Sequence, residues 1–170
     1  DLTDKASIIN TLNEFKPSVI ANAAAYTAVD KAETERELAF KLNADSPGIM
    51  ADCAAKHDAL MIHYSTDYVF DGTKKEPWTE DDKPNPLNVY GESKLAGDVN
   101  IQSSGCKHLI FRTSWVYGAR GKNFYLTMRR LLQEKDEIHV VNDQYGAPTW
   151  CRTIAEATAQ ALAQVQSPMC

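Results

Sequence analysis

Tyr90 and Lys94 stand four positions apart in the stretch "NVYGESKLAG" (residues 88–97), which otherwise has a helical pattern. In an α-helix this spacing places both side chains on one face, about one turn apart. A phenol, with an ordinary pKa of about 10, is a sluggish acid at neutral pH, and a nearby cation lowers that pKa. We therefore expect Lys94 to lower the pKa of Tyr90 and prepare it for proton transfer. The alternative is a surface lysine stacked on an exposed tyrosine, because this spacing is a short pattern.

Hydroxyl and carboxylate groups also occur together in the stretch "HYSTDYVFDG" (residues 63–72). Ser65, Thr66 and Asp67 stand where a buried strand passes into a loop, which is where α/β sheets carry ligand-binding groups. Such hydroxyls can bind a substrate oxygen. The alternative is structural, since Ser, Thr and Asp also cap turns and bond to local backbone.

The elements that position these residues alternate along the chain. Strand-like apolar runs and helical patterns follow one another, with a polar loop rich in Gly and Pro at residues 71–86. The expected strands are 18–25, 59–66, 107–114 and 137–141, and the expected helices are 8–15, 29–43, 45–57 (Ser46 as N-cap, Pro47 in the first turn), one from near Val89, 123–135 and 152–166. This order predicts a doubly wound α/β fold with a parallel sheet, in one domain over residues 1–170.

Composition excludes several classes of function. The 170 residues carry a formal charge of -5 and no basic stripe, which disfavours nucleic-acid binding. We expect no membrane span and a cytoplasmic location, because no apolar run approaches 20 residues and the first residues lack a signal-peptide pattern. The four cysteines (Cys53, Cys106, Cys151, Cys170) and four histidines show no metal-ligand spacing, so we expect incidental thiols and no metal site.

Five stretches together resemble the successive signatures of the dTDP-4-dehydrorhamnose reductase family of extended short-chain dehydrogenases/reductases. They occur in the family's order, at residues 22–33, 63–72, 85–97, 112–118 and 143–149. The resemblance implies an NAD(P)-binding Rossmann-type fold and a Thr-Tyr-Lys triad at Thr66, Tyr90 and Lys94. It further implies hydride transfer from NADH or NADPH to the C4 ketone of a dTDP-sugar, with Tyr90 donating the proton, Lys94 binding the nicotinamide ribose and Thr66 bonding the reacting oxygen.

Other roles also rest on the resemblance alone. Asp67 and Trp115 would contact the sugar nucleotide, whereas without the resemblance Trp115 is best read as a core aromatic. The residues implied at the cofactor are Asp1, Leu2, Ala25, Tyr26, Thr27 and Tyr64. The resemblance also suggests a divalent cation, which no residue cluster in this sequence supports.

One expected feature is missing from the sequence. No glycine-rich turn of the GxGxxG or GxxGxxG type is present to hold the pyrophosphate of a dinucleotide. Against the family pattern, the chain starts after the third strand and ends before the C-terminal part is complete, so we expect an incomplete sheet and weak binding of NADH or NADPH.

Two alternative functions stay open. A non-catalytic regulatory subunit, like the beta type of methionine adenosyltransferase, resembles the same family, although the intact Tyr90 and Lys94 favour an enzyme. A nucleotide-sugar epimerase or dehydratase is disfavoured, since a dehydratase is expected to have Asp-Glu after the threonine, whereas Asp67 is followed here by Tyr68.

We predict that the chain either self-associates through one edge of its sheet, most simply as a dimer, or packs its helices differently from the enzymes that it resembles. Strands missing beside residues 18–25 would leave unpaired backbone groups along that edge, and such an edge pairs readily with another chain. Size-exclusion chromatography with light scattering should give a mass above that of one chain; a well-folded monomer would contradict the prediction.

Overall fold

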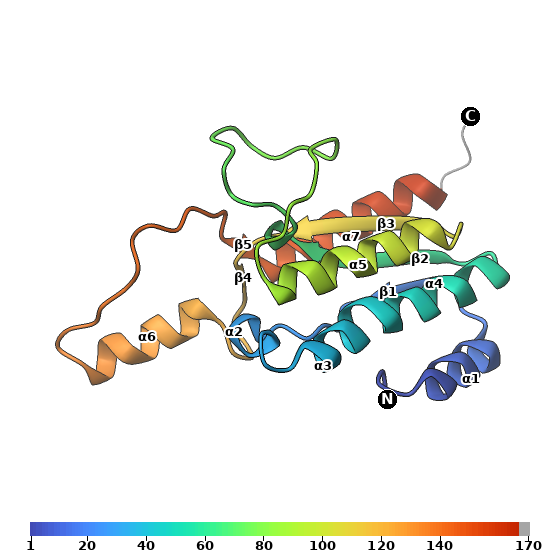
Figure 1. Ribbon diagram of the computed structural model, residues 1–170, viewed down its shortest axis with the longest axis horizontal. Helices are drawn as coiled ribbons and strands as arrows, with labels where there is room; N and C mark the ends of the chain where they lie inside the picture. The colour runs from blue at the N-terminus through green and yellow to red at the C-terminus, as the bar shows by residue number, and fades with distance from the viewer. Residues whose placement is uncertain (167–170) are drawn as a thin grey trace. The chain divides into compact units, whose positions relative to one another are not determined.

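The computed structural model describes residues 1–166, so Cys170 lies outside the described residues, and it divides into two compact units. The first unit runs from Asp1 to Arg112, and the second begins at Thr113. The elements of the first unit (Figure 1) are α1 (Lys5–Phe15), β1 (Val19–Asn22), α2 (Val29–Ala32), α3 (Arg36–Phe40), the π-helix η1 (Lys41–Asp45), α4 (Ser46–Lys56), β2 (Leu60–Thr66), the 3-10 helix η2 (Asp67–Val69), α5 (Val89–Ser103) and β3 (Lys107–Thr113), which ends at the boundary. The second unit contains β4 (Val116–Tyr117), α6 (Phe124–Glu134), β5 (Thr149–Trp150) and α7 (Cys151–Gln166). The single-domain interpretation stays a prediction.

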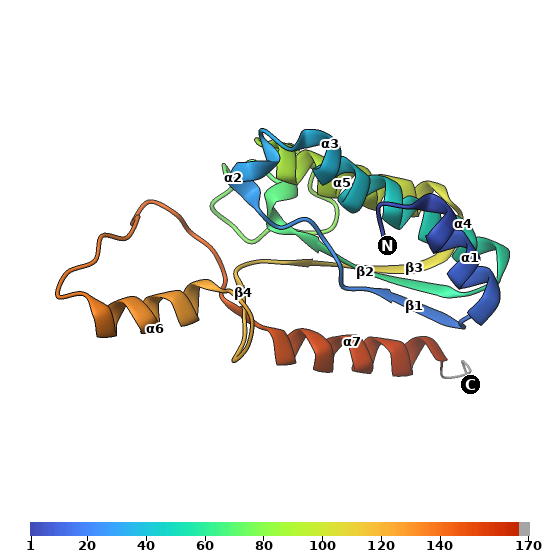
Figure 2. The same cartoon turned by 90° about the horizontal axis from the view of Figure 1, so that it is seen from below.

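The first unit is built on a sheet in which β2 lies between β1 and β3. β1 and β2 are parallel, with Val19 opposite Leu60 and Asn22 opposite His63. Figure 2 shows α3, α4 and α5 together on one face of this sheet. The predicted α/β fold with parallel strands is therefore confirmed.

The central strand β2 is buried along its length except at the half-buried Tyr64. On the face toward the helices, Met61 packs with Ile8 of α1, Met50 of α4 and Ile101 of α5 in the main apolar core. Burial on both sides explains why the first three residues of β2, Leu60, Met61 and Ile62, are all apolar and do not alternate with polar ones. The sheet thus holds the end of β2, with Thr66, in a fixed position.

Helix α5 begins where the sequence predicts, near Val89, and lies very close to its neighbours. Asn88 caps it, accepting a hydrogen bond from the N–H of Gly91 at 2.8 Å. A Cβ at Gly97 would stand 2.1 Å from the carbonyl oxygen of Asn43, and one at Gly91 would stand 2.2 Å from that of Tyr68. Only glycine permits this close approach of α5 to η1 and η2.

The predicted helices at 29–43 and 45–57 differ in detail from the structure. The first is divided into α2 and α3, and a π-helix joins α3 to α4 without a break. Ser46 as an N-cap is wrong, because Asp45 before it is already helical (φ −68°, ψ −47°). The Ser46 hydroxyl instead lies 2.6 Å from the carbonyl of Leu2 and 2.7 Å from that of Lys41.

The strand predicted at residues 137–141 is wrong. In the described part of the chain this segment pairs with no strand, and its apolar Val140 and Val141 are exposed. Without a partner, an apolar alternation does not make a strand, since strand hydrogen bonds run between segments. The strands of the second unit are instead the short parallel pair β4 and β5, in which Val116 stands opposite Thr149.

Within residues 1–166, no helix is both long and apolar enough to cross a membrane, and no three potential metal ligands gather. The thiols of Cys53 and Cys106 are free and buried, and that of Cys151 is free and exposed.

Replacement of Gly97 by Ala should lower the free energy of unfolding by about 3 kcal/mol, because the new methyl group would overlap a backbone carbonyl that cannot move aside. Urea denaturation measures the loss. Gly48→Ala is the matched control: its Cβ would meet only the side chain of Asn100, at 3.1 Å, and alanine favours a helix by about 1 kcal/mol over glycine. Equal stabilities of the two variants would contradict the prediction.

Candidate active site

One face of α5 carries Tyr90, Lys94 and Asp98 at four-residue intervals, and this face lies on β2. Each of the three side chains meets a different part of the strand. Tyr90 meets Thr66 at the strand end, Lys94 meets the backbone of Tyr64, and Asp98 meets Ser65. The four-residue spacing of Tyr90 and Lys94 therefore continues for one more turn, to Asp98.

The structure brings Thr66 and Tyr90 together. Thr66 is the hydrogen-bonding neighbour of Tyr90 that lowers the pKa of its phenol. The Thr66 hydroxyl donates to Asp67 Oδ1 at 3.2 Å and accepts from the N–H of Tyr68 at 3.2 Å. The ring of Tyr68 stands edge-on to that of Tyr90, with centroids 5.5 Å apart. Two hydroxyls thus converge at the end of β2.

The electrostatic state of Tyr90 differs from the prediction. Burial raises the pKa of Tyr90 above its ordinary value of 10.0, and the charge of Asp67 raises it further, against a lowering by the hydrogen bond with Thr66. The expected lowering of this pKa by Lys94 is wrong, because the lysine ammonium faces the sheet. Tyr90 is therefore a fully protonated phenol at neutral pH.

Lys94 is only 1% exposed. Its ammonium donates a hydrogen bond to the carbonyl of Tyr64 at 2.7 Å and lies 3.1 Å from Nε2 of His63. Burial lowers the pKa of Lys94 to about 8, and the charge of Asp98 acts in the opposite direction. An ionisable lysine so deep in the protein costs stability unless the groups around it compensate its charge.

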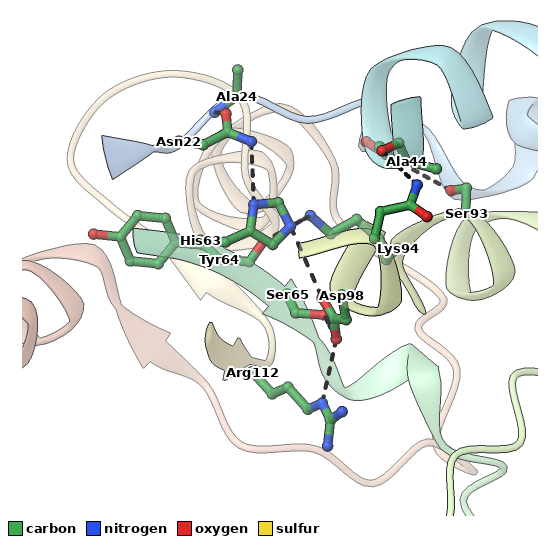
Figure 3. A network of polar contacts seen from close by, with 12 residues as sticks. Asn22, Ala24, Ala44, His63, Tyr64, Ser65, Ser93, Lys94, Asp98 and Arg112 are labelled. Atoms are coloured by element: carbon green, nitrogen blue, oxygen red, sulfur yellow. Dashed lines mark hydrogen bonds and ion pairs between the residues drawn. The ribbon is translucent and has the colours of Figure 1, made fainter. Parts of the chain in front are cut away.

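A buried polar network surrounds this ammonium (Figure 3). His63 is completely buried; its Nδ1 lies 3.2 Å from the side-chain nitrogen of Asn22, and its Nε2 lies 4.0 Å from Oδ1 of Asp98. Asp98 Oδ2 accepts a hydrogen bond from Ser65 at 2.8 Å and is 3.6 Å from Nε of Arg112. Burial lowers the pKa of His63 to about 3, with a further lowering by the charge of Lys94. Burial raises the pKa of Asp98, whereas Ser65, Arg112 and Lys94 lower it.

The loop after β1, with the predicted cofactor residues Ala25, Tyr26 and Thr27, is anchored through its middle residue. The buried amide of Asn43 accepts a hydrogen bond from the N–H of Tyr26 at 2.8 Å and donates one to its carbonyl at 2.9 Å. Ala25 and Thr27 on either side are exposed. The Tyr26 hydroxyl donates to Glu35 at 2.6 Å, and this bond raises the pKa of Tyr26 to about 12.

Asp1 and Leu2 lie in a groove of about 400 Å³ along β1. The groove reaches Asn22, Ala23 and Ala24, which immediately precede the predicted residue Ala25. Small side chains leave this end of β1 open to the close approach of a ligand.

The two remaining predicted site residues belong to different units, Tyr64 to the first and Trp115 to the second. The carbonyl of Tyr64 binds Lys94, but its ring stacks on Phe111 of β3, with centroids 6.0 Å apart. Trp115 belongs to the second unit, where its indole would lie 2.5 Å from a Cβ at Gly146. Its backbone is left-handed (φ 43°) and its side chain is 45% exposed. A bulky residue held in this conformation marks local strain, which is common at ligand sites.

Sequence reasoning missed Asn43, His63 and Asp98. Asp98 carried a usable signal, because it repeats the four-residue spacing of Tyr90 and Lys94. His63 carried a weaker one, since alternation along β2 places it on the same side as Ser65. Asn43 carried none, because its inward position depends on a π-helix.

The chain is similar in sequence to proteins of known family. The sequence model of the RmlD substrate binding domain matches residues 1–169. The dTDP-4-dehydrorhamnose reductase of Salmonella typhimurium is 52% identical over 162 residues, which are 95% of this chain and 54% of that protein. The chain thus spans about half the length of the curated relatives it matches.

Solved structures agree with this match. A dTDP-4-dehydrorhamnose reductase from Bacillus anthracis, in complex with NADP, superposes with a TM-score of 0.94 at 38% identity, over 99% of this chain and 60% of that one. An orthologous reductase from Clostridium acetobutylicum gives a TM-score of 0.93 at 42% identity, over 96% and 58%. The predicted Rossmann-type fold is confirmed by these superpositions.

The buried His63 predicts a pH-dependent stability. Its pKa is about 3 in the folded chain and about 6.5 when unfolded, so the unfolded state binds the extra proton between these values. The resulting stability is complete above pH 6.5 and is lost as pH falls toward 3, by up to about 1.4 kcal/mol per pH unit. His63→Gln should flatten this part of the profile in urea denaturation. His57→Gln, whose ring bonds Asn13 at the surface, is the control. A variant at His63 with the wild-type slope would contradict the assignment.

Proposed function

Because the chain belongs to the RmlD substrate-binding domain family, we propose that it carries the proton-donating part of an NAD(P)H-dependent reductase. The proposed reaction reduces the C4 ketone of dTDP-4-dehydrorhamnose to give dTDP-L-rhamnose. Relatives named for this reaction match almost the whole chain.

The observation that carries the proposal is the meeting of the Thr66 and Tyr90 side chains at the end of the central strand. A ketone oxygen placed between the two hydroxyls would receive two hydrogen bonds. Both bonds strengthen as negative charge grows on that oxygen, so they stabilise the transition state more than the ground state.

The raised pKa of Tyr90 suits a proton donor. The phenol stays protonated before the reaction and is still a stronger acid than the alcohol that forms at C4. When the carbonyl oxygen becomes an alkoxide, the proton moves from Tyr90 to that oxygen, which keeps the hydrogen bond donated by Thr66. Proton transfer therefore needs no prior lowering of the tyrosine pKa.

A reduced nicotinamide, NADPH or NADH, supplies the hydride when bound. The small residues at the end of β1 fit a dinucleotide, because the groove there is not filled by large side chains. The residues proposed to hold the cofactor are Asp1, Leu2, Ala25, Tyr26, Thr27, Tyr64, Tyr90 and Lys94. The relative from Bacillus anthracis holds NADP, which supports this class of cofactor.

Asp67 and Trp115 are proposed to contact the dTDP-sugar. Asp67 follows Thr66 in the chain, and its side chain accepts a hydrogen bond from the Thr66 hydroxyl. Trp115 combines a strained backbone with a partly exposed indole, as expected for a ring that stacks on a ligand.

Cellular location and assembly are also proposed. Buried free thiols at Cys53 and Cys106 suit a reducing compartment, the cytoplasm. A homo-oligomer, such as a dimer, would cover the β1 side of the sheet, where Ala21 and Ala23 are exposed.

Tyr90→Phe should lower kcat by about 10²- to 10⁴-fold, because the phenol supplies the proton. It should change the Kd for NADPH much less, because the other residues proposed to hold the cofactor are unchanged. The assay follows NADPH or NADH oxidation with dTDP-4-dehydrorhamnose, and fluorescence titration gives the cofactor affinity.

The matched control is Tyr68→Phe, which removes the hydroxyl of the adjacent ring and should change kcat only a few-fold. A Tyr90→Phe protein as active as the control would refute the assignment of the proton donor. A wild-type protein that binds cofactor but reduces no sugar would favour the regulatory-subunit alternative.

A further inference from the structure

Three buried groups around Lys94 remain unused by the proposed reaction. His63 and Asp98 are 0% and 1% exposed, and Arg112 is partly buried beside them. Polar side chains so deep in a core cost stability, so their presence at the ammonium requires a physical reason.

The negative charge of Asp98 stabilises the protonated form of Lys94. Both stand on one face of α5, four residues apart, and the charge of Asp98 favours the protonated lysine. Asp98 Oδ2 is occupied by Ser65 and faces Arg112, whereas Asp98 Oδ1 has no hydrogen-bond partner in the described structure. That free oxygen is directed into the space shared with His63 (Figure 3).

The direction of its hydrogen bonds makes His63 favour the neutral form of Lys94. The N–H of Ala24 donates to Oδ1 of Asn22 at 3.2 Å, which fixes the amide and turns its NH₂ group toward Nδ1 of His63. Nδ1 must then accept, so the ring proton lies on Nε2 and points at Lys94 Nζ, 3.1 Å away. An N–H in this position can donate to a neutral amine but not to an ammonium.

The titratable and charged groups around Lys94 come from several elements. They are His63 on β2, Tyr90 and Asp98 on the same face of α5 and, beside Asp98, Arg112 on β3. Of these, Asp98 is the one whose charge acts on Lys94 to favour its protonation.

We propose that Asp98 and His63 are positioning residues that act in opposite directions on the charge of Lys94. Asp98 is the buried counter-ion that stabilises the ammonium, whereas the Nε2–H of His63, oriented by Asn22, stabilises the neutral amine. The lysine therefore changes its charge readily while it stays hydrogen-bonded to the carbonyl of Tyr64. The link to catalysis rests on the proposed reduction, but the effect on the lysine does not.

The direct test is a titration of Lys94 by NMR of its side-chain ¹³Cε, assigned with Lys94→Arg, in the chain without substrate or cofactor. Asp98→Asn should move the Lys94 midpoint about one pH unit or more toward acid, because the anion is lost. His63→Gln should move it toward alkali, because the glutamine amide can rotate and present its oxygen. Shifts of opposite sign cannot come from general loosening of the core.

The control is Glu92→Gln, which removes a carboxylate from the same helix where it pairs with Arg36 at the surface, and it should leave the midpoint unchanged. If Asp98→Asn does not fold, Asp98→Glu decides: a near-wild-type midpoint supports the counter-ion role. Shifts of the same sign at both positions, or an Asp98→Glu midpoint that departs from wild type, would overturn the proposal.

The pH profile of kcat/KM gives a second readout in the active protein. Its alkaline limb should move in the same directions as the lysine titration, down in pH for Asp98→Asn and up for His63→Gln. If no reduction is found but the two titration shifts appear, the charge relation stands and the proposed function fails. If Tyr90→Phe abolishes reduction but neither Asp98→Asn nor His63→Gln shifts the titration, the proposed function stands and the charge relation fails.

Discussion

The close approach of α5 to its neighbours is the constraint on which the rest of the first unit depends. At Gly91 and Gly97 the helix touches backbone carbonyls, with no room for a Cβ. This approach places Tyr90 beside Thr66 and pushes Lys94 into a space where water cannot solvate its charge. Burial therefore has two consequences at once, since it keeps the tyrosine protonated and makes the lysine easy to deprotonate.

The network around Lys94 costs stability as well as providing chemistry. A neutral imidazole, a carboxylate and an ammonium lie where apolar side chains would pack at lower free energy. Such groups are usually retained for function, because replacing them improves packing but removes the charge pattern. In this chain α1, α4, α5 and β2 share one apolar core beside these groups.

The sequence was sufficient for features that depend on local pattern and was insufficient for those that depend on partners. The apolar run of β2 and the start of α5 followed from periodicity and spacing, whereas the association of Thr66 with Tyr90 was implied by the family resemblance alone. The segment 137–141 has a strand-like pattern, but a strand forms only where another segment offers hydrogen bonds. The pKa of Tyr90 was predicted with the wrong sign, because the spacing of two side chains on a helix does not reveal which way the lysine ammonium turns. Asn43 could not be found at all, since its inward direction arises from a π-helix.

That π-helix also limits how the chain can change in length. One extra residue in a helical turn rotates everything after it by about 100°. The residues before η1 pack with Val89 and Tyr26, whereas those after it pack with Ile8 and Met61, so the two faces are offset by the wider turn. Deletion of a single residue between Lys41 and Asp45 would restore an ordinary helix but rotate one of these faces into solvent. The segment is therefore expected to tolerate substitutions on its exposed side while its residue count stays fixed.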